Sequence, residues 1–448
     1  MIQKKNPANL TEGSIVRGLL GFAVPLFLGQ LLQQLYNMAD AWVVGNFAEN
    51  EAFAAVSMAS HISFLIIGFF NGIAIGGGVV ISRYFGAKNE KETERAIHTN
   101  FLFGIGASVL STIVGVLLVP RLLVWMHTPE SVMPHALVYF RIYFGGVSTI
   151  IMYNICMAIM RALGDSLHPL YYLIVSSCMN VALDLLFVAG FHWGVGGAAA
   201  TVLSQGLSAV LCIVRMCKIK DYTGLDFRKL KIYRDVLSQV IHQGLPSGLQ
   251  NSVISIGNLV VQANINSFGA YAISGHGAYS KIEGLVFLPI MSMSMALPTF
   301  ISQNLGAGEY RRAKKGAFFG IMSGMVMAEL VGLVLYAGCE QALQLFVDTP
   351  EAIRFGMIHG HTVALFFFLL AFSHCAAGVM RGCGKAMIPM AVMLASWCGI
   401  RIVYVTAALK VVNEFQMISW AYPLTWTISS GAFLYYMKKI DWTRGFES

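Results

Sequence analysis

Long apolar segments, separated by short polar stretches, follow one another along the whole chain. A transmembrane helix needs about 20 predominantly apolar residues, and twelve segments reach that length. Several are longer than a bilayer requires, so we expect tilted or kinked helices. The predicted helices are residues 15–44, 52–82, 96–120, 134–160, 167–190, 195–217, 236–266, 272–302, 314–338, 353–380, 386–410 and 415–437. This pattern predicts an all-α polytopic membrane protein with twelve transmembrane helices.

Composition excludes a soluble globule. Of 448 residues, 56% are hydrophobic and only 12% are charged, whereas charged residues make up about 25% of soluble domains. The eight cysteines form no C-x-x-C pair and lie in or beside apolar segments. We therefore interpret them as buried free thiols and expect neither a metal centre nor a cofactor.

Lysine and arginine are concentrated in alternate loops. They cluster near the N-terminus (Lys4, Lys5), after the even-numbered helices and in the tail, and residues 215–234 alone carry seven. Cytoplasmic loops of membrane proteins hold the excess of these residues. We therefore expect a multi-pass protein of the cell's inner (plasma) membrane with both termini in the cytoplasm. The net charge of +8 reflects this topology and not a nucleic-acid partner.

The two halves of the chain repeat with an offset of 220–221 residues. Pro25 pairs with Pro246, and the tripeptide Thr-Pro-Glu occurs at 128–130 and again at 349–351. Each half holds six predicted helices, so both copies have the same orientation, as in transporters built from parallel repeats. The predicted division is an N-terminal six-helix lobe, a cytoplasmic linker and a C-terminal six-helix lobe: residues 1–217, 218–235 and 236–448.

Glycines in the second predicted helix do not form a nucleotide site. Gly72 and Gly76 make a G-x-x-x-G motif inside the helix, which predicts close helix packing or a flexible point. The chain has no G-x-x-x-x-G-K-[ST] phosphate loop, so we expect no ATP hydrolysis.

Several motifs together resemble the multidrug and toxic compound extrusion (MATE) family. They are PLFLGQLLQQLYNMADAWVVG at 25–45, RYFGAK at 83–88, RALGD at 161–165, MNVALD at 179–184 and QNLGAG at 303–308. The resemblance covers nearly the whole chain and implies export of organic, often cationic, compounds in exchange for protons or sodium ions. The aspartate of helix 1 and the N-x-x-x-D of helix 5 are similar to the DinF-like branch. The acids of helices 7 and 10, on which the NorM-like branch relies, are missing here.

Polar residues at one depth of the N-terminal half form the candidate site. Asp40, Asp184 and Thr201 each lie a few residues from the non-cytoplasmic end of a predicted helix. Tyr36 precedes Asp40 by four positions, and Asn180 precedes Asp184 by four, so each pair shares a helix face. Intramembrane charges are costly, so we interpret the group as an ion-coupling and substrate-binding site for a proton, or for sodium at the two aspartates. Interfacial acids that are solvated near helix ends are the alternative.

Two further residues complete the prediction. The resemblance adds Asn154, which lies nearer the cytoplasmic end of helix 4. Pro25 lies inside helix 1, where a proline removes a backbone hydrogen bond and permits bending. The repeat maps Asp184 onto Tyr404, so we expect the acid pair to operate only in the N-terminal half.

The C-terminal half has intramembrane charges of its own. Lys281, Glu283, Glu329 and Arg401 lie inside predicted helices. They either form ion pairs with one another or contact substrate. We interpret His276 as a packing or cavity residue because no metal-ligand spacing accompanies it.

These observations predict a secondary active antiporter and not an enzyme. It would export amphipathic or cationic organic compounds (multidrug efflux) by alternating access. An exporter or flippase of lipid-linked or polar metabolites on the same architecture is the alternative, and an ion channel would conduct without coupling. Asp40 and Asp184 match neither the Y-D nor the G-x-G-D sequence of intramembrane aspartyl proteases. We expect small organic substrates and the bilayer as partners, no nucleic acid, and a monomer without an obligatory protein partner.

Overall fold

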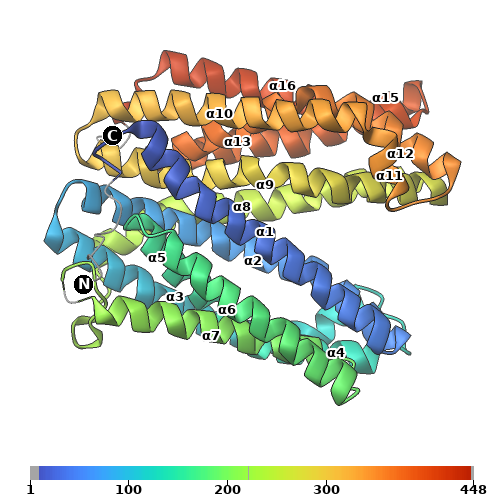
Figure 1. The fold of residues 1–448 in the computed structure, drawn as a ribbon, viewed down its shortest axis with the longest axis horizontal. Coiled ribbons are helices and arrows are strands. Elements are labelled where there is room, and N and C mark those ends of the chain that lie inside the picture. Colours follow the sequence, from blue (N-terminus) through green and yellow to red (C-terminus); the bar gives the residue numbers. More distant parts are fainter. Residues whose placement is uncertain (1–9, 220, 445–448) are drawn as a thin grey trace. The chain divides into compact units, whose positions relative to one another are not determined.

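The protein is helical throughout the part that the structure describes. The computed structural model describes residues 10–219 and 221–444, and within these ranges it contains no strand. The α-helices (Figure 1) are α1 Ile15–Phe47, α2 Asn50–Gly86, α3 Glu90–Trp125, α4 Met133–Gly145, α5 Val147–Ala162, α6 Leu167–Asp184, α7 Gly196–Lys218, α8 Arg234–Asn266, α9 Ala270–Gly306, α10 Tyr310–Ala337, α11 Cys339–Gln344, α12 Pro350–Val363, α13 Phe367–Gly382, α14 Met387–Met393, α15 Arg401–Val411 and α16 Phe415–Lys439. Short 3-10 or π-helical turns occupy Leu185–Gly190, Phe227–Lys229, Ala364–Phe366, Leu394–Ile400 and Trp442–Arg444. Lys4, Lys5 and Lys220, which the charge pattern counts as cytoplasmic, lie outside the described residues.

The twelve predicted segments are all helical, which confirms the fold class. Within the described ranges, ten helical segments are long and apolar enough to cross a membrane. The remaining two, α8 and α16, are 33 and 25 residues long but carry more polar side chains. Gln243 and Gln250 of α8 and Ser429 and Ser430 of α16 are all buried, which is where membrane proteins keep polar groups of their helices.

The chain forms two compact units. Unit 1 comprises Leu28–Gly248, and unit 2 comprises Leu10–Phe27 together with the chain from Leu249 onward. The boundaries of these units fall inside the long helices α1 and α8.

Prolines lie close to both boundaries. Pro25 of α1 and Pro246 of α8 precede the change of unit by a few residues, and the repeat had paired them. Each proline removes a hydrogen bond of its helix, but both helices continue through the proline without a break.

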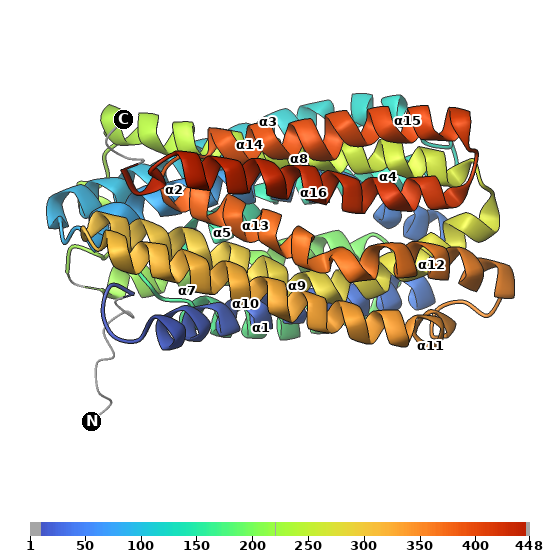
Figure 2. The same cartoon turned by 90° about the horizontal axis from the view of Figure 1, so that it is seen from above.

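Packing explains why the start of α1 belongs to unit 2. Leu19, Phe22 and Leu26 are buried in one core with side chains of α9, α10 and α13, three helices that run side by side (Figures 1 and 2). The guanidinium of Arg312 donates hydrogen bonds to the carbonyls of Leu10, Glu12 and Gly13 at 2.6–3.2 Å. These contacts fasten the chain just before α1 to the start of α10.

Among its described residues, unit 1 has two apolar cores. One gathers buried side chains of α2, α3, α5 and α7 around Phe101 and Ile159. The other joins Val44 of α1 and Ala198 of α7 to aromatic residues of α4, including Phe140. The second core borders the predicted site, since Val44 and Ala198 lie in the same helices as Asp40 and Thr201.

The internal repeat reappears in the backbone. Gly164 and Gly384 follow α5 and α13 with φ of 86° and 80°, and Lys88 and Gly308 follow α2 and α9 with φ of 53° and 74°. The members of each pair are 220 positions apart. Equivalent helices of the two halves therefore end in the same left-handed turn, a conformation that favours glycine.

Glycines allow α2 and α8 to cross in close contact within unit 1. A methyl group on Gly72 would lie 2.4 Å from the backbone nitrogen of Gly248, and one on Gly76 would lie 2.2 Å from that of Gly244. Gly244 and Gly248 are themselves spaced as G-x-x-x-G, so two such motifs face each other. The sequence prediction of close packing at Gly72 and Gly76 is confirmed.

Candidate functional site

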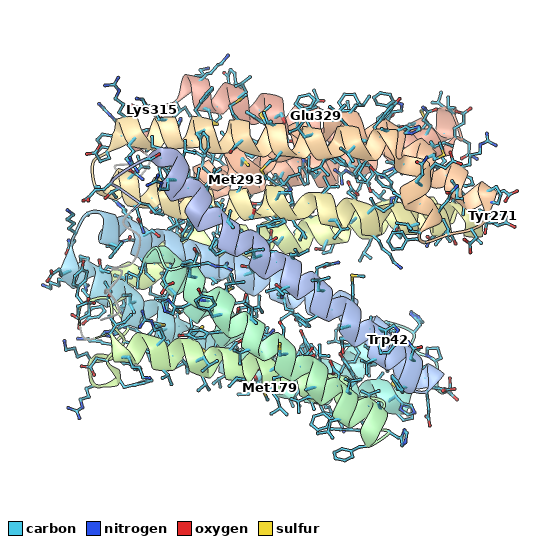
Figure 3. The ribbon with its side chains drawn as sticks, viewed as in Figure 1. Trp42, Met179, Tyr271, Met293, Lys315 and Glu329 are labelled. Atoms are coloured by element: carbon cyan, nitrogen blue, oxygen red, sulfur yellow. The ribbon has the colours of Figure 1, made fainter. Side chains whose placement is uncertain are left out.

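Asp40 of α1 and Asp184 of α6 meet at the first turn of α7. A methyl group on Gly197 would lie 3.3 Å from Oδ1 of Asp40 and 3.6 Å from Oδ1 of Asp184. Both carboxylates therefore border one small space, which is open because residue 197 has no side chain. On the other side of α1, two positions beyond Asp40, Trp42 is 59% exposed (Figure 3).

The acceptor atoms of this site have no donor among the described residues. Oδ1 of Asp40 and both carboxylate oxygens of Asp184 are buried without a hydrogen-bond partner. The amide nitrogen and oxygen of Asn180, one turn before Asp184 and 1% exposed, are also unpaired. An unpaired buried polar group costs about 1–3 kcal/mol, and more when it is charged. Such a cluster therefore suits a proton or a small cation.

Two tyrosines lie near the carboxylates. The hydroxyls of Tyr36 and Tyr139 both interact electrostatically with Asp40 and with Asp184. Tyr36 was predicted, whereas Tyr139 of α4 was missed. Its only sequence signal is the spacing of four from Tyr143, with which it stacks at a centroid distance of 6.5 Å, and in an apolar helix that spacing is ordinary.

The other predicted residues have different surroundings. Thr201 lies one turn after Gly197 in α7, so both lie on one helix face. Asn154 is buried in α5, where its side-chain amide donates to the carbonyl of Ile150 at 2.8 Å. The amide donor of Asn154 is therefore used within its own helix.

The helix that carries Asp184 changes its winding at the site. Asp184 is the last residue of α6, and Leu185–Gly190 form a π-helical turn directly after it. In unit 2 a π-helical turn at Leu394–Ile400 instead precedes Arg401. These turns are frequent at functional sites, and their different places distinguish the two halves of the repeat.

Arg401 is the centre of a buried polar cluster in unit 2. It is 2% exposed and donates to Oγ1 of Thr425 at 3.0 Å and to Oδ1 of Asn258 at 3.4 Å. Its guanidinium carbon lies 4.5 Å from the ring centroid of Tyr422. Glu283 interacts with Arg401 electrostatically, but no ion pair within 4.0 Å joins them in the described part of the chain.

Neither Lys281 nor Glu329 forms an ion pair with any other described residue, so the ion-pair interpretation is wrong for these two residues. Lys281 is exposed, and its Nζ lies 5.6 Å from the ring centroid of Phe346. Glu329 (labelled on α10 in Figure 3) accepts a hydrogen bond from the backbone nitrogen of Phe368 at 3.2 Å.

Histidines of unit 2 pack against each other and against aromatic rings. The rings of His276 and His359 are 4.7 Å apart, and Nδ1 of His359 lies 3.0 Å from Oγ of Ser419. His276 was predicted from the sequence as a packing or cavity residue, whereas His359 was not, because it comes close only through the packing of α12 against α9. Among the residues that the structure describes, no three His, Cys, Asp or Glu side chains are grouped to hold a metal ion.

Comparison with known proteins matches both halves of the chain. The sequence model of the MatE family matches residues 25–186 and 246–406. The probable multidrug resistance protein YpnP of Bacillus subtilis (strain 168) is 27% identical over 430 residues, which cover 96% of each chain.

Solved structures share the fold. An outward-facing multidrug resistance MATE family transporter of the MOP superfamily superposes with a TM-score of 0.90 at 20% identity, over 100% of both chains. A MOP superfamily transporter from Pyrococcus furiosus gives a TM-score of 0.90 at 19% identity, also over 100% of both chains, and is described by a binding pocket of reverse polarity that suggests a different function. A shared fold therefore does not fix the substrate. With the family model matching most of its length in two equivalent stretches, this chain belongs to the MATE family of multi-pass membrane transporters.

Proposed function

We propose that this chain is a secondary antiporter that exports amphipathic or cationic organic compounds in exchange for protons, with Asp40 and Asp184 binding the proton. The observation that carries this proposal is the meeting of the two carboxylates beside Gly197, with buried oxygens that have no donor among the residues described by the structure. A proton on either carboxyl group supplies a donor to the other and removes one of two like charges. Protonation therefore supplies the missing hydrogen-bond donor and relieves the repulsion between the two carboxylates at the same time.

Coupling follows from competition for the same charge. With both aspartates ionised, the site attracts an organic cation, and once protonated it does so less. By linkage, each ligand then weakens the binding of the other. We further propose that the two repeat-related lobes alternate in access and that α1 bends at Pro25 during the cycle.

Sodium is the second candidate ion. It would need several oxygen ligands, and Asp40, Asp184, Asn180, Tyr36 and Thr201 could supply them. The same residues therefore serve either ion, and transport measurements must separate the two.

Export of a phosphate-bearing metabolite or lipid-linked compound is less well supported. Such a substrate asks for free cationic groups. Arg401 already donates to Thr425 and Asn258, whereas the unpaired groups of the candidate site, Asp40, Asp184 and Asn180, are two acids and an amide.

The test is uptake of the fluorescent cation ethidium into inverted membrane vesicles that contain the protein. We expect uptake when the vesicle interior is acidified, and none with a sodium gradient alone. Uptake under the sodium gradient alone would assign sodium to the site. Uptake equal to that of vesicles without the protein under both gradients would overturn the proposed function.

Gly197→Ala should impair transport without unfolding the protein. The added methyl group would lie 3.3 Å from Oδ1 of Asp40, so this carboxylate must shift by a few tenths of an ångström and the methyl group would occupy the space proposed for the ion. We expect at least about tenfold slower ethidium transport, since a small shift of a binding group can cost that much. Gly206→Ala in the same helix is the control, because its methyl group would make an ordinary contact of 3.4 Å with Thr149. Equal transport by the two variants would argue against the space beside Gly197.

We also propose that the chain is of the DinF-like branch and lies in the plasma membrane, as a monomer with cytoplasmic termini. The acid pair of unit 1 supports the branch, and the distribution of lysine and arginine supports the orientation.

Reporter fusions test the orientation. We expect reporters at residues 88, 226 and 314 to lie in the cytoplasm and those at residues 49, 192 and 347 to lie outside. A reporter at residue 226 that lies outside would contradict the orientation, because the surrounding stretch 215–234 carries seven cations.

A further inference from the structure

A strongly basic pocket lies in unit 1, between α3 and the linker that joins α7 to α8. Its volume is about 760 Å³. It is lined by Lys91, Glu94, Arg95, His98, Arg228, Lys229, Leu230, Lys231 and Tyr233. Five cationic side chains thus face a single acid, and the proposed transport mechanism uses none of them.

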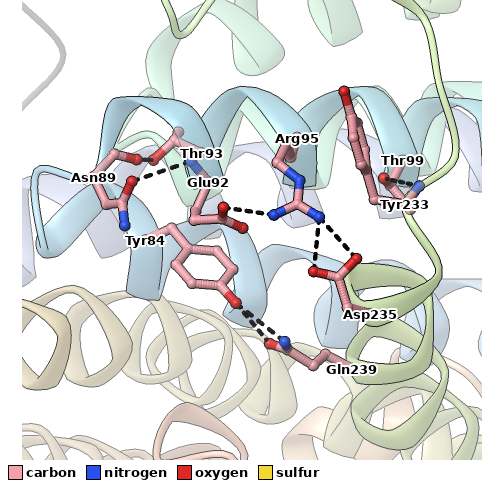
Figure 4. A network of polar contacts seen from close by, with 9 residues as sticks. All are labelled: Tyr84, Asn89, Glu92, Thr93, Arg95, Thr99, Tyr233, Asp235 and Gln239. Atoms are coloured by element: carbon pink, nitrogen blue, oxygen red, sulfur yellow. Dashed lines mark hydrogen bonds and ion pairs between the residues drawn. The ribbon is translucent and has the colours of Figure 1, made fainter.

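Specific contacts hold the linker against α3 and shape this pocket (Figure 4). Arg95 donates to Glu92 at 2.6 Å and to both carboxylate oxygens of Asp235 at 2.8 and 2.9 Å. Its guanidinium carbon lies 4.4 Å from the ring centroid of Tyr233, whose backbone nitrogen donates to Oγ1 of Thr99 at 3.2 Å. The charge of Arg95 is therefore used in building the pocket.

A second set of contacts fixes the middle of the linker. The backbone nitrogen of Asp226 donates to Nε2 of His98 at 3.3 Å, and Oδ1 of Asp226 accepts from the backbone nitrogen of Arg228 at 2.9 Å. Lys229 pairs with Glu94 at 2.9 Å, so the single acid of the pocket is also engaged.

Three cations of the pocket have no acidic partner. No carboxylate within 4.0 Å pairs with Lys91, Arg228 or Lys231 in the described ranges. Beside them, Phe227 and Ile232 are 56% and 46% exposed. The linker thus presents free cationic groups next to exposed apolar side chains, a combination that suits the headgroup and the acyl chain of a lipid.

We propose that this pocket binds the headgroup of an anionic phospholipid such as phosphatidylglycerol, with Lys91, Arg228 and Lys231 contacting the phosphate. The pocket lies where α3 begins, at Glu90, and where α7 ends, at Lys218, so it is at the polar ends of two membrane-spanning helices. Basic pockets at helix ends attract anionic lipids, and ammonium and guanidinium groups bind phosphate oxygens through charge-assisted hydrogen bonds. The exposed side chains of Phe227 and Ile232 favour a lipid over a soluble anion, because they offer apolar contacts that only the acyl chain of a lipid can use.

Native mass spectrometry of the purified full-length protein tests this assignment. The protein is titrated with phosphatidylglycerol, or with phosphatidylcholine of the same acyl chains. We expect tighter binding of phosphatidylglycerol, and the double variant Arg228→Gln/Lys231→Gln should weaken it about 30-fold, at about fivefold for each cation removed. Binding of phosphatidylcholine should not change.

Matched variants separate the site from general electrostatic attraction. Arg311→Gln/Lys315→Gln removes two cations from the start of α10, outside the pocket, and should leave binding of phosphatidylglycerol unchanged. Arg228→Lys/Lys231→Arg keeps the charge and should retain binding. An equal loss in the α10 variant, a loss in the charge-retaining variant, or equal affinity for both lipids would overturn the proposal. Binding of glycerol phosphate as tight as that of phosphatidylglycerol would overturn the assignment to a lipid.

Discussion

Proton-driven export should fall to the level of empty vesicles when Asp184 is replaced by Asn. The substitution keeps the size and one acceptor of the side chain but removes the group that takes up the proton. Folding should be retained, and the free energy of unfolding should stay equal or rise by about 1–3 kcal/mol, because a buried unpaired carboxylate is replaced by a neutral amide. Ethidium uptake into inverted vesicles and thermal unfolding of the purified protein measure the two effects.

Asp40→Asn should give the same result, because the two carboxylates act as a pair. Tyr404→Phe is the control, since Tyr404 occupies the position equivalent to Asp184 in the other half of the repeat, and it should leave coupling intact. If both aspartate variants export at near wild-type rates, the site in unit 1 is wrong. Glu283 and Glu329 of unit 2 would then be the next candidates.

Equilibrium binding separates loss of coupling from loss of motion. In the wild-type protein, acidification should weaken binding of an organic cation because protons and the cation compete for Asp40 and Asp184. The Asp184→Asn protein should lose most of this pH dependence, by the reciprocity of linked binding. An unchanged pH dependence would place the titrating group elsewhere.

The pairing of Asp40 with Asp184 could be predicted from the sequence because helix geometry determines depth. Counting residues from a predicted helix end gives the level of a side chain at about 1.5 Å per residue, and both acids came out at one level. Tyr139 could not be predicted in this way. It interacts electrostatically with the carboxylates from α4, and nothing in an apolar helix marks which face meets another helix.

The role of Gly197 could not be predicted from the sequence either. In the sequence it is one glycine of the run GVGGAAA, which is equally consistent with ordinary helix packing. Its contribution is the missing side chain between two particular carboxylates, and this depends on the meeting of α1, α6 and α7. Arg401 donates hydrogen bonds to Thr425 and Asn258 and forms no ion pair with a described acid. These polar neighbours from α16 and α8 lie closer to it than an acid does.

The unit boundaries also depend on packing and not on composition. The charged linker at 218–235 is the natural division in the sequence, since charge and turn residues concentrate there. In the structure, the residues before Leu28 contribute Leu19 and Phe22 to the core of unit 2. The sequence signals near the two unit boundaries are Pro25 and Pro246, which the repeat pairs with each other.

Gly76→Ala should destabilise the protein strongly although alanine is the better helix former. The methyl group would lie 2.2 Å from the backbone nitrogen of Gly244, and neither backbone can move aside without separating α2 from α8. Overpacking of this kind costs about 1–3 kcal/mol, and because the clash is between two backbones we expect a loss at the upper end, about 3 kcal/mol. Thermal unfolding of the purified variant should show it, together with reduced transport, because α8 passes from unit 1 to unit 2 four residues beyond Gly244.

Gly106→Ala in α3 is the matched control for this crossing. Apart from the adjacent backbone of its own helix, no atom of the described residues lies within 4 Å of a methyl group at that position, so the change adds helix propensity without a clash. It should leave stability unchanged or raise it by about 0.5–1 kcal/mol. Gly244→Ala, approached from the other helix, should destabilise as Gly76→Ala does, since its methyl group would lie 2.9 Å from the carbonyl oxygen of Ile73. If Gly76→Ala and Gly106→Ala unfold at the same temperature, the close contact between α2 and α8 does not exist in the membrane protein.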